Sequence, residues 1–434
     1  MKEVYQMLKV SEVRCCGLKA PVGLDQGRIE FSWKLESDER DVVQSTYQIV
    51  VTDLSDGAVM WDSKKVEDEK QNGVLYEGEP LKSNREYRYE VTVTDNHGNE
   101  AGSEAQTFTM GLYENEWKAK WIGCQNSDLD AGVRMATKEE MVKSFLAMMA
   151  GDTVAFTADR KLDACNIYRK EFEVKGGIRK SWLSITAHGL YEARINGRQV
   201  TDTCFNPGFT AYDKYLEYQT YDVTELLCEG TNVLTIVLAD GWYKGKFGIL
   251  GYGNNYGVEN AVLAQMELQF EDETAKQIVT DEMFEYAQSA FVYSDILIGE
   301  KQDGRIDMEK YYRPGTVSGM KKAQEKQYGY ENLHGICCEP VRCTEIIRPQ
   351  RIFETPKGEL IADMGQNIVG TVRISVQGDC GTEIKLEHSE VLDKEGNFIN
   401  NVSGVNRDQT DYYILRAKNR RFSSRDSHST ASVM

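Results

Sequence analysis

The chain lacks the surplus of positive charge through which proteins bind nucleic acids and anionic membranes. Its 434 residues include 51 Lys and Arg against 69 Asp and Glu, a formal net charge of −18. Both polyanions are held mainly by excess Lys and Arg. We therefore expect neither nucleic acid nor membrane as a partner. Small neutral or basic molecules remain possible ligands.

Long hydrophobic runs are also missing. No window of about 18 apolar residues occurs, so no membrane-spanning helix is expected. The N-terminus, MKEVYQMLKVSEVRCCG, has neither the apolar core nor the cleavage site of a secretory signal. The ten cysteines are irregularly spaced and form no CxxC pair, which favours reduced thiols over a disulfide framework. Together these features predict a cytoplasmic protein.

The motifs of common catalytic and cofactor sites are absent too. The five histidines show no HxH or HxxxH spacing and no cysteine has the spacing of a zinc ligand, so no metal site is predicted. Nothing in the sequence indicates calcium or any other cofactor. The nucleophile-elbow, phosphate-loop and dinucleotide motifs do not occur. The best isolated acid–base candidate is HSE, with His388 and Glu390, although a polar pair at a strand end is the simpler interpretation.

Strand patterns dominate what is present. Ile29, Phe31 and Trp33 alternate with polar residues, as do Tyr87, Tyr89, Val91 and Val93. A period of two is typical of half-buried antiparallel strands. Asn196-Gly197 lies between two further strand runs and predicts a tight hairpin, because both residues tolerate positive φ. The apolar run TNVLTIVLAD predicts a strand in the centre of a sheet.

One segment departs from this pattern. In ATKEEMVKSFLAMMAG, Thr137 precedes Glu140 by three residues, which is a capping box. Met141, Phe145, Leu146 and Met149 follow at helical spacing, and Gly151 can end the helix. We expect this helix to pack on the next domain.

The predicted fold class is all-β: tandem β-sandwich domains with one short helical insertion. The domain plan has five parts: a fibronectin III or immunoglobulin-like sandwich over 1–112, a linker over 113–166 with the helix at 137–150, a jelly-roll-like sandwich over 167–330, an incomplete β-domain over 331–416, and a tail over 417–434.

The stretch ADGWYKGKFG at 239–248 is the candidate binding site. Asp240, Trp242 and Tyr243 lie in a Gly-rich loop after the apolar strand. Aromatic rings there can stack on a sugar, or they can pack between domains, since Trp and Tyr favour boundaries that are half wet and half apolar. Packing is the favoured interpretation.

Longer stretches carry a family resemblance. The run YLEYQTYDVTELLCEGTNVLTIVLADGWYKGKFG, with the upstream LYEARINGRQV and FNPGFTAYDK, resembles the N-terminal β-sandwich of bacterial α-L-rhamnosidases. IADMGQNIVGTVRISVQGDCGTEIKLEHSEVLDKEGNFI and RDQTDYYILR resemble the next β-domain of that family, glycoside hydrolase family 78. The opening sandwich, closed by WKAKWIG, is similar to the fibronectin-like domain that often precedes them.

The resemblance implies an inverting glycosidase that releases terminal α-L-rhamnose from glycosides. Inversion requires a general acid and a general base on opposite sides of the scissile bond. In the family these carboxylates lie on an (α/α)₆ barrel that follows the β-domains, and this sequence contains no such run of helices. We therefore assign no catalytic residue and expect the chain to be inactive alone, with the catalytic barrel as its missing partner. The open alternatives are a stand-alone carbohydrate-binding array and a structural or interaction β-protein.

The last residues lose the strand pattern. RAKNRRFSSRDSHSTASVM is rich in Ser and Arg, and compatible codons read in another frame can spell KPEVFEPRFTFHGFRY, which continues the family's style. We therefore expect residues 417–434 to be an aberrant, frameshifted tail.

Overall fold

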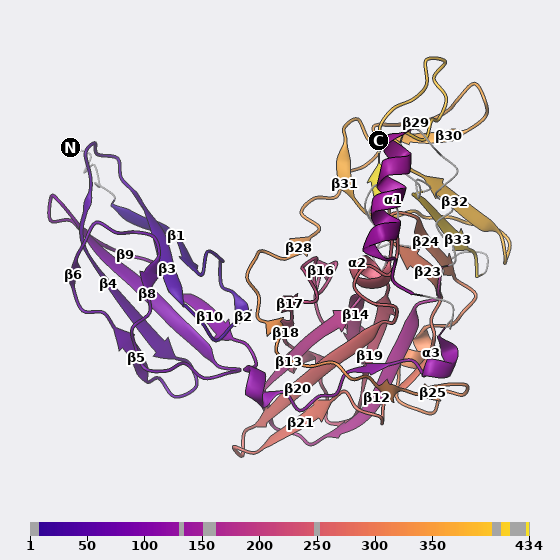
Figure 1. The fold of residues 1–434 in the computed structure, drawn as a ribbon. Helices are drawn as coiled ribbons and strands as arrows, with labels where there is room; N and C mark the ends of the chain where they lie inside the picture. Colours follow the sequence, from indigo (N-terminus) through magenta and orange to yellow (C-terminus); the bar gives the residue numbers. More distant parts are fainter. Residues whose placement is uncertain are drawn as a thin grey trace.

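The computed structural model describes residues 8–129, 134–150, 162–246, 252–401, 409–416 and 431–433. Strands make up nearly all of the regular structure, and they assemble into two sandwiches and a smaller third group (Figure 1). The all-β prediction is therefore confirmed. In the described part of the chain, no helix has the length and apolar character of a membrane span.

The first sandwich packs a small sheet, β1-β3-β7, on a larger one, β2-β10-β8-β4-β5, with β6 and β9 at its margins. The alternating residues predicted from sequence lie inside it: Phe31, Tyr87, Tyr89 and Val91 have no exposed surface. Its strands are β1 (Lys9–Cys15), β2 (Val22–Leu24), β3 (Glu30–Glu36), β4 (Gln44–Asp53), β5 (Val59–Asp62), β6 (Val66–Glu67), β7 (Val74–Leu75), β8 (Glu86–Asp95), β9 (Glu100–Gly102) and β10 (Gln106–Met110).

The second sandwich has two six-stranded sheets, β18-β13-β20-β11-β26 with β21 beside β20, and β15-β14-β19-β12-β22-β25. One apolar core draws on both sheets, which identifies them as the two layers. The strands are β11 (Ile122–Gly123), β12 (Asn166–Val174), β13 (Ile178–His188), β14 (Leu190–Ile195), β15 (Arg198–Gln199), β18 (Gln219–Asp222), β19 (Gly230–Ala239), β20 (Ala261–Phe270), β21 (Ala275–Val279), β22 (Glu285–Gln288), β25 (Lys321–Lys322) and β26 (Gln324–Glu325).

Two local predictions are confirmed in this sandwich. Asn196 and Gly197 have φ of 52° and 81° and join β14 to β15, where Ile195 pairs with Arg198. Strand β19 lies between β12 and β14, and it is buried from Asn232 to Ala239, as expected of a central strand that is covered on both faces.

Part of the segment predicted to link the two sandwiches is built into the second one. Ile122 of β11 pairs with Val262 of β20 and with Glu325 of β26. The hydroxyl of Thr280 donates to the carbonyl of Lys120 at 2.7 Å, and the backbone N–H of Lys120 donates to the carbonyl of Thr280 at 2.7 Å. The domain boundaries near residues 112 and 330 stay predictions.

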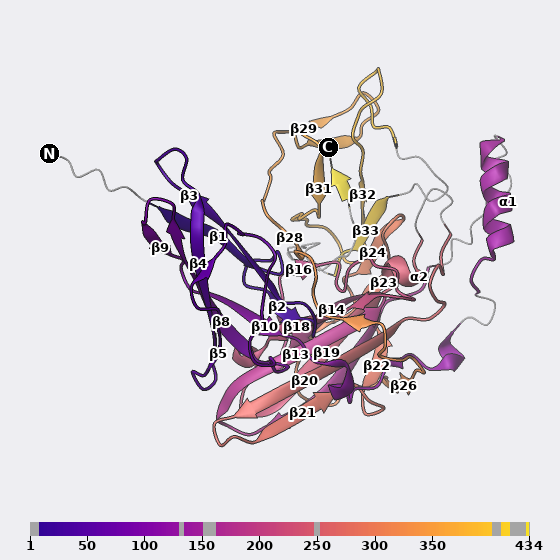
Figure 2. The same cartoon turned by 60° about the vertical axis from the view of Figure 1, so that its left-hand side comes forward.

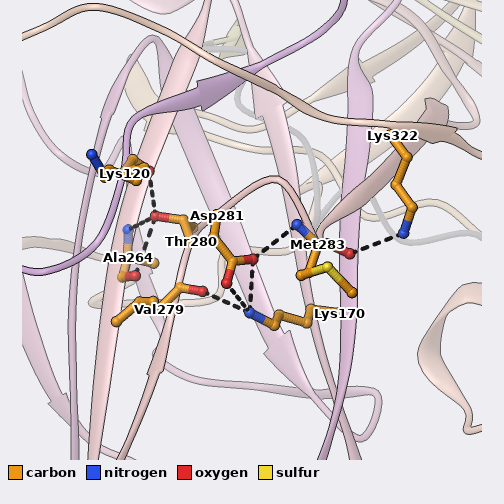
Figure 3. Close-up of polar contacts among 8 residues, drawn as sticks. All are labelled: Lys120, Lys170, Ala264, Val279, Thr280, Asp281, Met283 and Lys322. Carbon is orange, nitrogen blue, oxygen red and sulfur yellow. Dashed lines mark hydrogen bonds and ion pairs between the residues drawn. The ribbon is translucent and has the colours of Figure 1, made fainter.

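A charged cluster lies beside this attachment (Figure 3). The Lys170 ammonium donates to both carboxylate oxygens of Asp281, at 2.8 and 2.7 Å, and to the carbonyl of Val279 at 3.1 Å. Asp281 also accepts the N–H of Met283 at 3.0 Å. This half-buried ion pair holds the turn after β21 against β12.

Helix α1 (Lys138–Met149) forms where the sequence predicts it. The capping box is present: the N–H of Thr137 donates to Glu140 at 2.8 Å, and the N–H of Glu140 donates to the Thr137 hydroxyl at 3.2 Å. The expected packing on the next domain is not found for most of its apolar stripe, because Phe145, Leu146 and Met149 are exposed. Figure 2 shows α1 standing to one side of the sandwich, and a hydrogen bond joins the hydroxyls of Ser144 and Tyr252.

The third group of strands combines distant parts of the chain. The hairpin β23 (Phe291–Asp295) and β24 (Gly299–Asp303) continues into β33 (Thr410–Ile414) and β32 (Glu383–Glu387). Ile384 and Leu386, which alternate with polar residues in the sequence, lie in β32, whereas residues 372–376 are irregular apart from a bridge at Ser375. Two small pairs complete the group: β29 (Arg351–Glu354) with β30 (Leu360–Asp363), and β31 (Ile368–Gly370) with β34 (Ala431–Val433). Two further pairs join loops of the second sandwich to the segment that follows it: β16 (Thr203–Cys204) with β28 (Val341–Arg342), and β17 (Leu216–Glu217) with β27 (Leu333–His334).

Two expectations fall largely outside the described residues. The predicted aberrant tail, 417–434, is described only at 431–433, which form β34. The glycine predicted to end the helix, Gly151, is also outside them.

Candidate functional site

The Asp-Gly-Trp-Tyr stretch follows directly from the central strand of the second sandwich. Strand β19 ends at Ala239, and the single helical turn α2 (Gly241–Lys244) begins two residues later. Gly241 has φ of +55°, and a Cβ there would lie 2.5 Å from Cγ of Leu190. Only glycine fits this turn without strain, so the chain can reverse sharply and send Trp242 and Tyr243 in different directions.

Tyr243 points into the protein. It is 5% exposed, and its ring is parallel to the imidazole of His188 with 4.4 Å between centroids. The ring of Trp121 also stacks on His188, with 4.4 Å between centroids, so the three rings form a column. The rings of Tyr212 and Tyr328 approach this column edge-on. The structure therefore places Tyr243 in an aromatic core.

His188 is a neutral member of that column. It is 6% exposed, and its Nδ1 finds no hydrogen-bond partner among the described residues. Burial lowers the pKa of His188 to about 3, because the charged imidazolium would lose its hydration without gaining a partner. At neutral pH this residue acts as a flat aromatic spacer between Trp121 and Tyr243.

Trp242 lies in a different environment. Its ring packs against Phe205 at 5.8 Å and Phe209 at 5.4 Å between centroids. Trp242 is partly buried, whereas Phe209 is 54% exposed. We call Phe205, Phe209 and Trp242 the aromatic surface cluster. An exposed aromatic ring beside a half-buried one has the amphipathic character of both domain contacts and sugar platforms.

Asp240 has a structural partner. The Lys244 ammonium lies 3.4 Å from Asp240 and 2.6 Å from Asp163. Burial, together with the neighbouring carboxylates of Asp163 and Asp295, raises the pKa of Asp240, and Lys244 opposes that rise. The ion pair of Lys244 with Asp163 anchors α2 to the segment before β12.

A second carboxylate fixes the end of the loop. Asp295 accepts the backbone N–H of Lys246 at 2.8 Å, and its other oxygen accepts the N–H groups of Leu297 and Ile298. Burial raises the pKa of Asp295. Three backbone donors on one carboxylate hold the loop and the β23–β24 turn together.

The acid–base candidate His388 and Glu390 is not assembled as a working pair. His388 is buried and faces Asp411, with Nε2 to Oδ2 at 3.2 Å. Glu390 is exposed and accepts a hydrogen bond from the amide of Asn401 at 3.4 Å. Strand β32 ends at Glu387, before either residue, so the strand does not hold the two side chains on one face.

The sequence analysis did not single out Phe205 and Phe209 as site residues. Both lie in FNPGF, a stretch quoted only for its resemblance. Two aromatic residues four apart, around a Pro-Gly pair, are a signal for an exposed turn. Their contact with Trp242 depends on tertiary structure.

Three family models match the chain in succession. The model described as "Rha78A-like, N-terminal immunoglobulin domain" matches residues 10–114. "Alpha-L-rhamnosidase N-terminal domain" matches residues 176–345. "Bacterial alpha-L-rhamnosidase concanavalin-like domain" matches residues 353–430. The matches follow the order of the two sandwiches and the third group of strands.

The curated relatives of this chain are α-L-rhamnosidases. An α-L-rhamnosidase of Formosa agariphila is 30% identical over 412 residues, which is 92% of this chain and 41% of the relative. An α-L-rhamnosidase of an Alteromonas species is 27% identical over 94% of this chain and 42% of its own length. The chain thus spans about two fifths of the length of these relatives.

Solved structures share the fold over nearly the whole chain. The α-L-rhamnosidase of Aspergillus terreus superimposes with a TM-score of 0.83 at 26% identity, covering 98% of this chain and 46% of that one. The α-L-rhamnosidase of Streptomyces avermitilis, solved with L-rhamnose, gives a TM-score of 0.83 at 24% identity and covers 98% of this chain and 55% of that one.

Proposed function

Because the chain belongs to the bacterial α-L-rhamnosidase family, in which it corresponds to the N-terminal, non-catalytic β-domains, we propose that it serves as the β-domain scaffold of an enzyme that hydrolyses terminal α-L-rhamnose from glycosides. One observation carries this proposal: three rhamnosidase domain models match the chain in order. The L-rhamnose named with the Streptomyces structure supports rhamnose-containing glycosides as the substrate class.

The proposal includes inactivity of the 434-residue chain by itself. The carboxylates around α2 support this inactivity, because Asp240 is paired with Lys244 and Asp295 accepts a backbone N–H. An inverting glycosidase instead needs two carboxyl groups about 6.5–9.5 Å apart across an open site. We expect no turnover of an aryl α-L-rhamnoside by the purified chain. Measurable turnover that is lost in Glu390→Gln would refute the non-catalytic assignment.

We propose that the third group of strands packs against the catalytic barrel of the full-length family members. Four large apolar side chains there are more than 60% exposed: Ile346, Ile352, Leu360 and Val369. Large apolar side chains that are exposed to solvent within one segment of a protein are a feature of contact sites. The chain should therefore bind a hydrophobic fluorescent dye, and Leu360→Ser with Val369→Ser should reduce that binding, whereas Val59→Ser in the first sandwich should not. Equal dye binding by all variants would contradict the assignment.

Direct carbohydrate binding by the chain is the alternative function. The observation that favours it is the exposed face of the aromatic surface cluster next to Asp240. Tyr243 is stacked on His188, so in this alternative a rhamnose ring would contact Trp242 and Phe209. Calorimetric titration with rhamnose distinguishes the two functions, because saturable binding that Phe209→Ala abolishes would support the alternative, and an absence of heat would support the scaffold.

We also propose a cytoplasmic, reducing location. All ten cysteines are free thiols in the structure, and unpaired cysteines in this number are typical of reducing compartments. A thiol count on the freshly isolated, unreduced protein tests this. Fewer than ten accessible thiols after denaturation would contradict it.

A further inference from the structure

Two adjacent cysteines and a distant buried glutamate meet at the junction of the two sandwiches. The carboxylate of Glu217 and the thiols of Cys337 and Cys338 all lie within 4.8 Å of one another. Glu217 belongs to β17, and the chain bends at Cys338. We call these three residues the thiol–carboxylate cluster. Glu217 and Cys337 are 120 positions apart in the sequence, so no spacing rule reveals the cluster.

The segment that carries the cysteines joins three parts of the protein. At 333–334 it forms β27, which pairs in parallel with β17 of the second sandwich. Two residues later, the N–H of Ile336 donates to the carbonyl of Gly23 at 3.0 Å, and its side chain packs on the core of the first sandwich. We call residues 333–338 the connecting strap. A ligand bound at its end would fasten the strap to β17.

The glutamate of the cluster is buried without a cationic partner. Glu217 is 5% exposed, and its Oε1 accepts the backbone N–H of Cys337 at 2.8 Å. Among the described residues, no Lys, Arg or His nitrogen forms an ion pair with it; the nearest candidate along the strap, His334, is paired with Asp25. Burial raises the pKa of Glu217. A buried carboxylate is costly unless a cation or several hydrogen bonds compensate for its charge.

We propose that Glu217, Cys337 and Cys338 form a binding site for a thiophilic divalent cation of the Zn²⁺ type, which fastens the connecting strap to the second sandwich. Two thiolates and one carboxylate match the donor preference of zinc, and a water molecule would complete four-coordination. The cation supplies the positive charge that the buried carboxylate lacks.

The geometry is close to that of such a site. Zinc binds sulfur at about 2.3 Å and carboxylate oxygen at about 2.0–2.2 Å in a tetrahedral arrangement, so its donor atoms lie roughly 3.5–3.8 Å apart. The donors here are already within 4.8 Å. Both cysteines are exposed, so their side chains can rotate to close the remaining gap without disturbing a core.

Cation binding must displace protons. Both thiols release a proton on coordination, so the apparent affinity should rise steeply with pH. A site formed only by exposed carboxylates would show little change between about pH 6 and pH 8, because those groups are already ionised there.

The test uses the purified full chain, reduced with a phosphine and freed of metal by a chelator. Titration with Cd²⁺ should produce the ultraviolet thiolate-to-cadmium absorption band with one equivalent bound, and Zn²⁺ should compete for it. The double variant Cys337→Ser/Cys338→Ser should lose the band. Glu217→Gln removes one of the three protein ligands and should weaken binding by about tenfold or more, because even the loss of a group that only orients a ligand costs about 10–100-fold in metal affinity.

Matched controls address the other thiols. Cys343→Ser removes an exposed cysteine outside the cluster, and Cys16→Ser interrupts the other adjacent pair, Cys15-Cys16; both variants should keep the band. Circular dichroism verifies that each variant is folded. A wild-type chain without the band, a double variant that retains it, or an unchanged affinity in folded Glu217→Gln would overturn the site.

Discussion

Acidification should destabilise the second sandwich through His188. This side chain is uncharged between Trp121 and Tyr243, and burial lowers its pKa from 6.5 to about 3. In the unfolded chain the same imidazole takes up a proton near its ordinary pKa. The stabilising contribution is therefore complete above about pH 6.5 and is lost as the pH falls from 6.5 towards 3.

The size of the effect follows from the two pKa values. One pKa unit corresponds to about 1.4 kcal/mol. With pKa values of 6.5 and about 3, linkage gives a loss of about 2.7 kcal/mol in the free energy of unfolding on going from pH 7.5 to about pH 4.5. This is a large share of the stability of a typical domain.

The comparison of two variants isolates this contribution from the many carboxylates that also titrate. His188→Phe keeps a flat ring in the column but cannot take up a proton, so its loss of stability between the two pH values should be smaller than that of the wild type by about 2–3 kcal/mol. His97→Gln changes an exposed histidine and should behave like the wild type. Urea unfolding at each pH measures the difference, and hydrogen exchange of residues 178–188 locates it in β13. Parallel pH profiles for the wild type and His188→Phe would refute the reasoning.

Three further perturbations test the packing. Trp242→Ala should cost about 2–3 kcal/mol, less than a fully buried aromatic residue, because its ring is only partly buried against Phe205 and Phe209; a stable variant that has lost rhamnose binding would instead favour the carbohydrate-binding alternative. Thr137→Ala removes the cap of α1 and should cost about 1 kcal/mol, seen as faster hydrogen exchange in that helix, whereas Thr107→Ala should leave it unchanged. Asp281→Ala leaves Lys170 half-buried without its partner and should lower the stability by about 1–3 kcal/mol, whereas an unchanged urea midpoint would show that water compensates for the lost pair.

Local features of the protein were predictable because their causes lie within a few residues. The period of two in β3 and β8 determines which side chains share a face, and Phe31, Tyr87 and Tyr89 are buried accordingly. The positive φ of Asn196 and Gly197 is a property of that dipeptide in a tight hairpin. Val372, Ile374 and Val376 also alternate in the sequence, which predicts a strand. That prediction was wrong, because these residues are irregular apart from a bridge at Ser375; alternation defines a face but does not supply a partner strand.

The candidate site depended on contacts that the sequence does not encode locally. The residues Trp242 and Tyr243 were recognisable as an aromatic pair, but their opposite environments follow from the sharp turn at Gly241 and from the position of His188 on β13. Phe209 reaches Trp242 from another loop.

The sequence by itself determined the all-β class, the hairpin, the helix cap and the family resemblance, since each depends on short-range pattern or on long runs of matching residues. Tertiary structure alone decided which faces meet: β24 pairs with β33 across more than 100 residues, and Cys337 lies beside Glu217. The physical reason is that such contacts are selected by the burial of whole surfaces against one another. A residue pattern specifies its own face, whereas its partner is fixed only when the complete chain has folded.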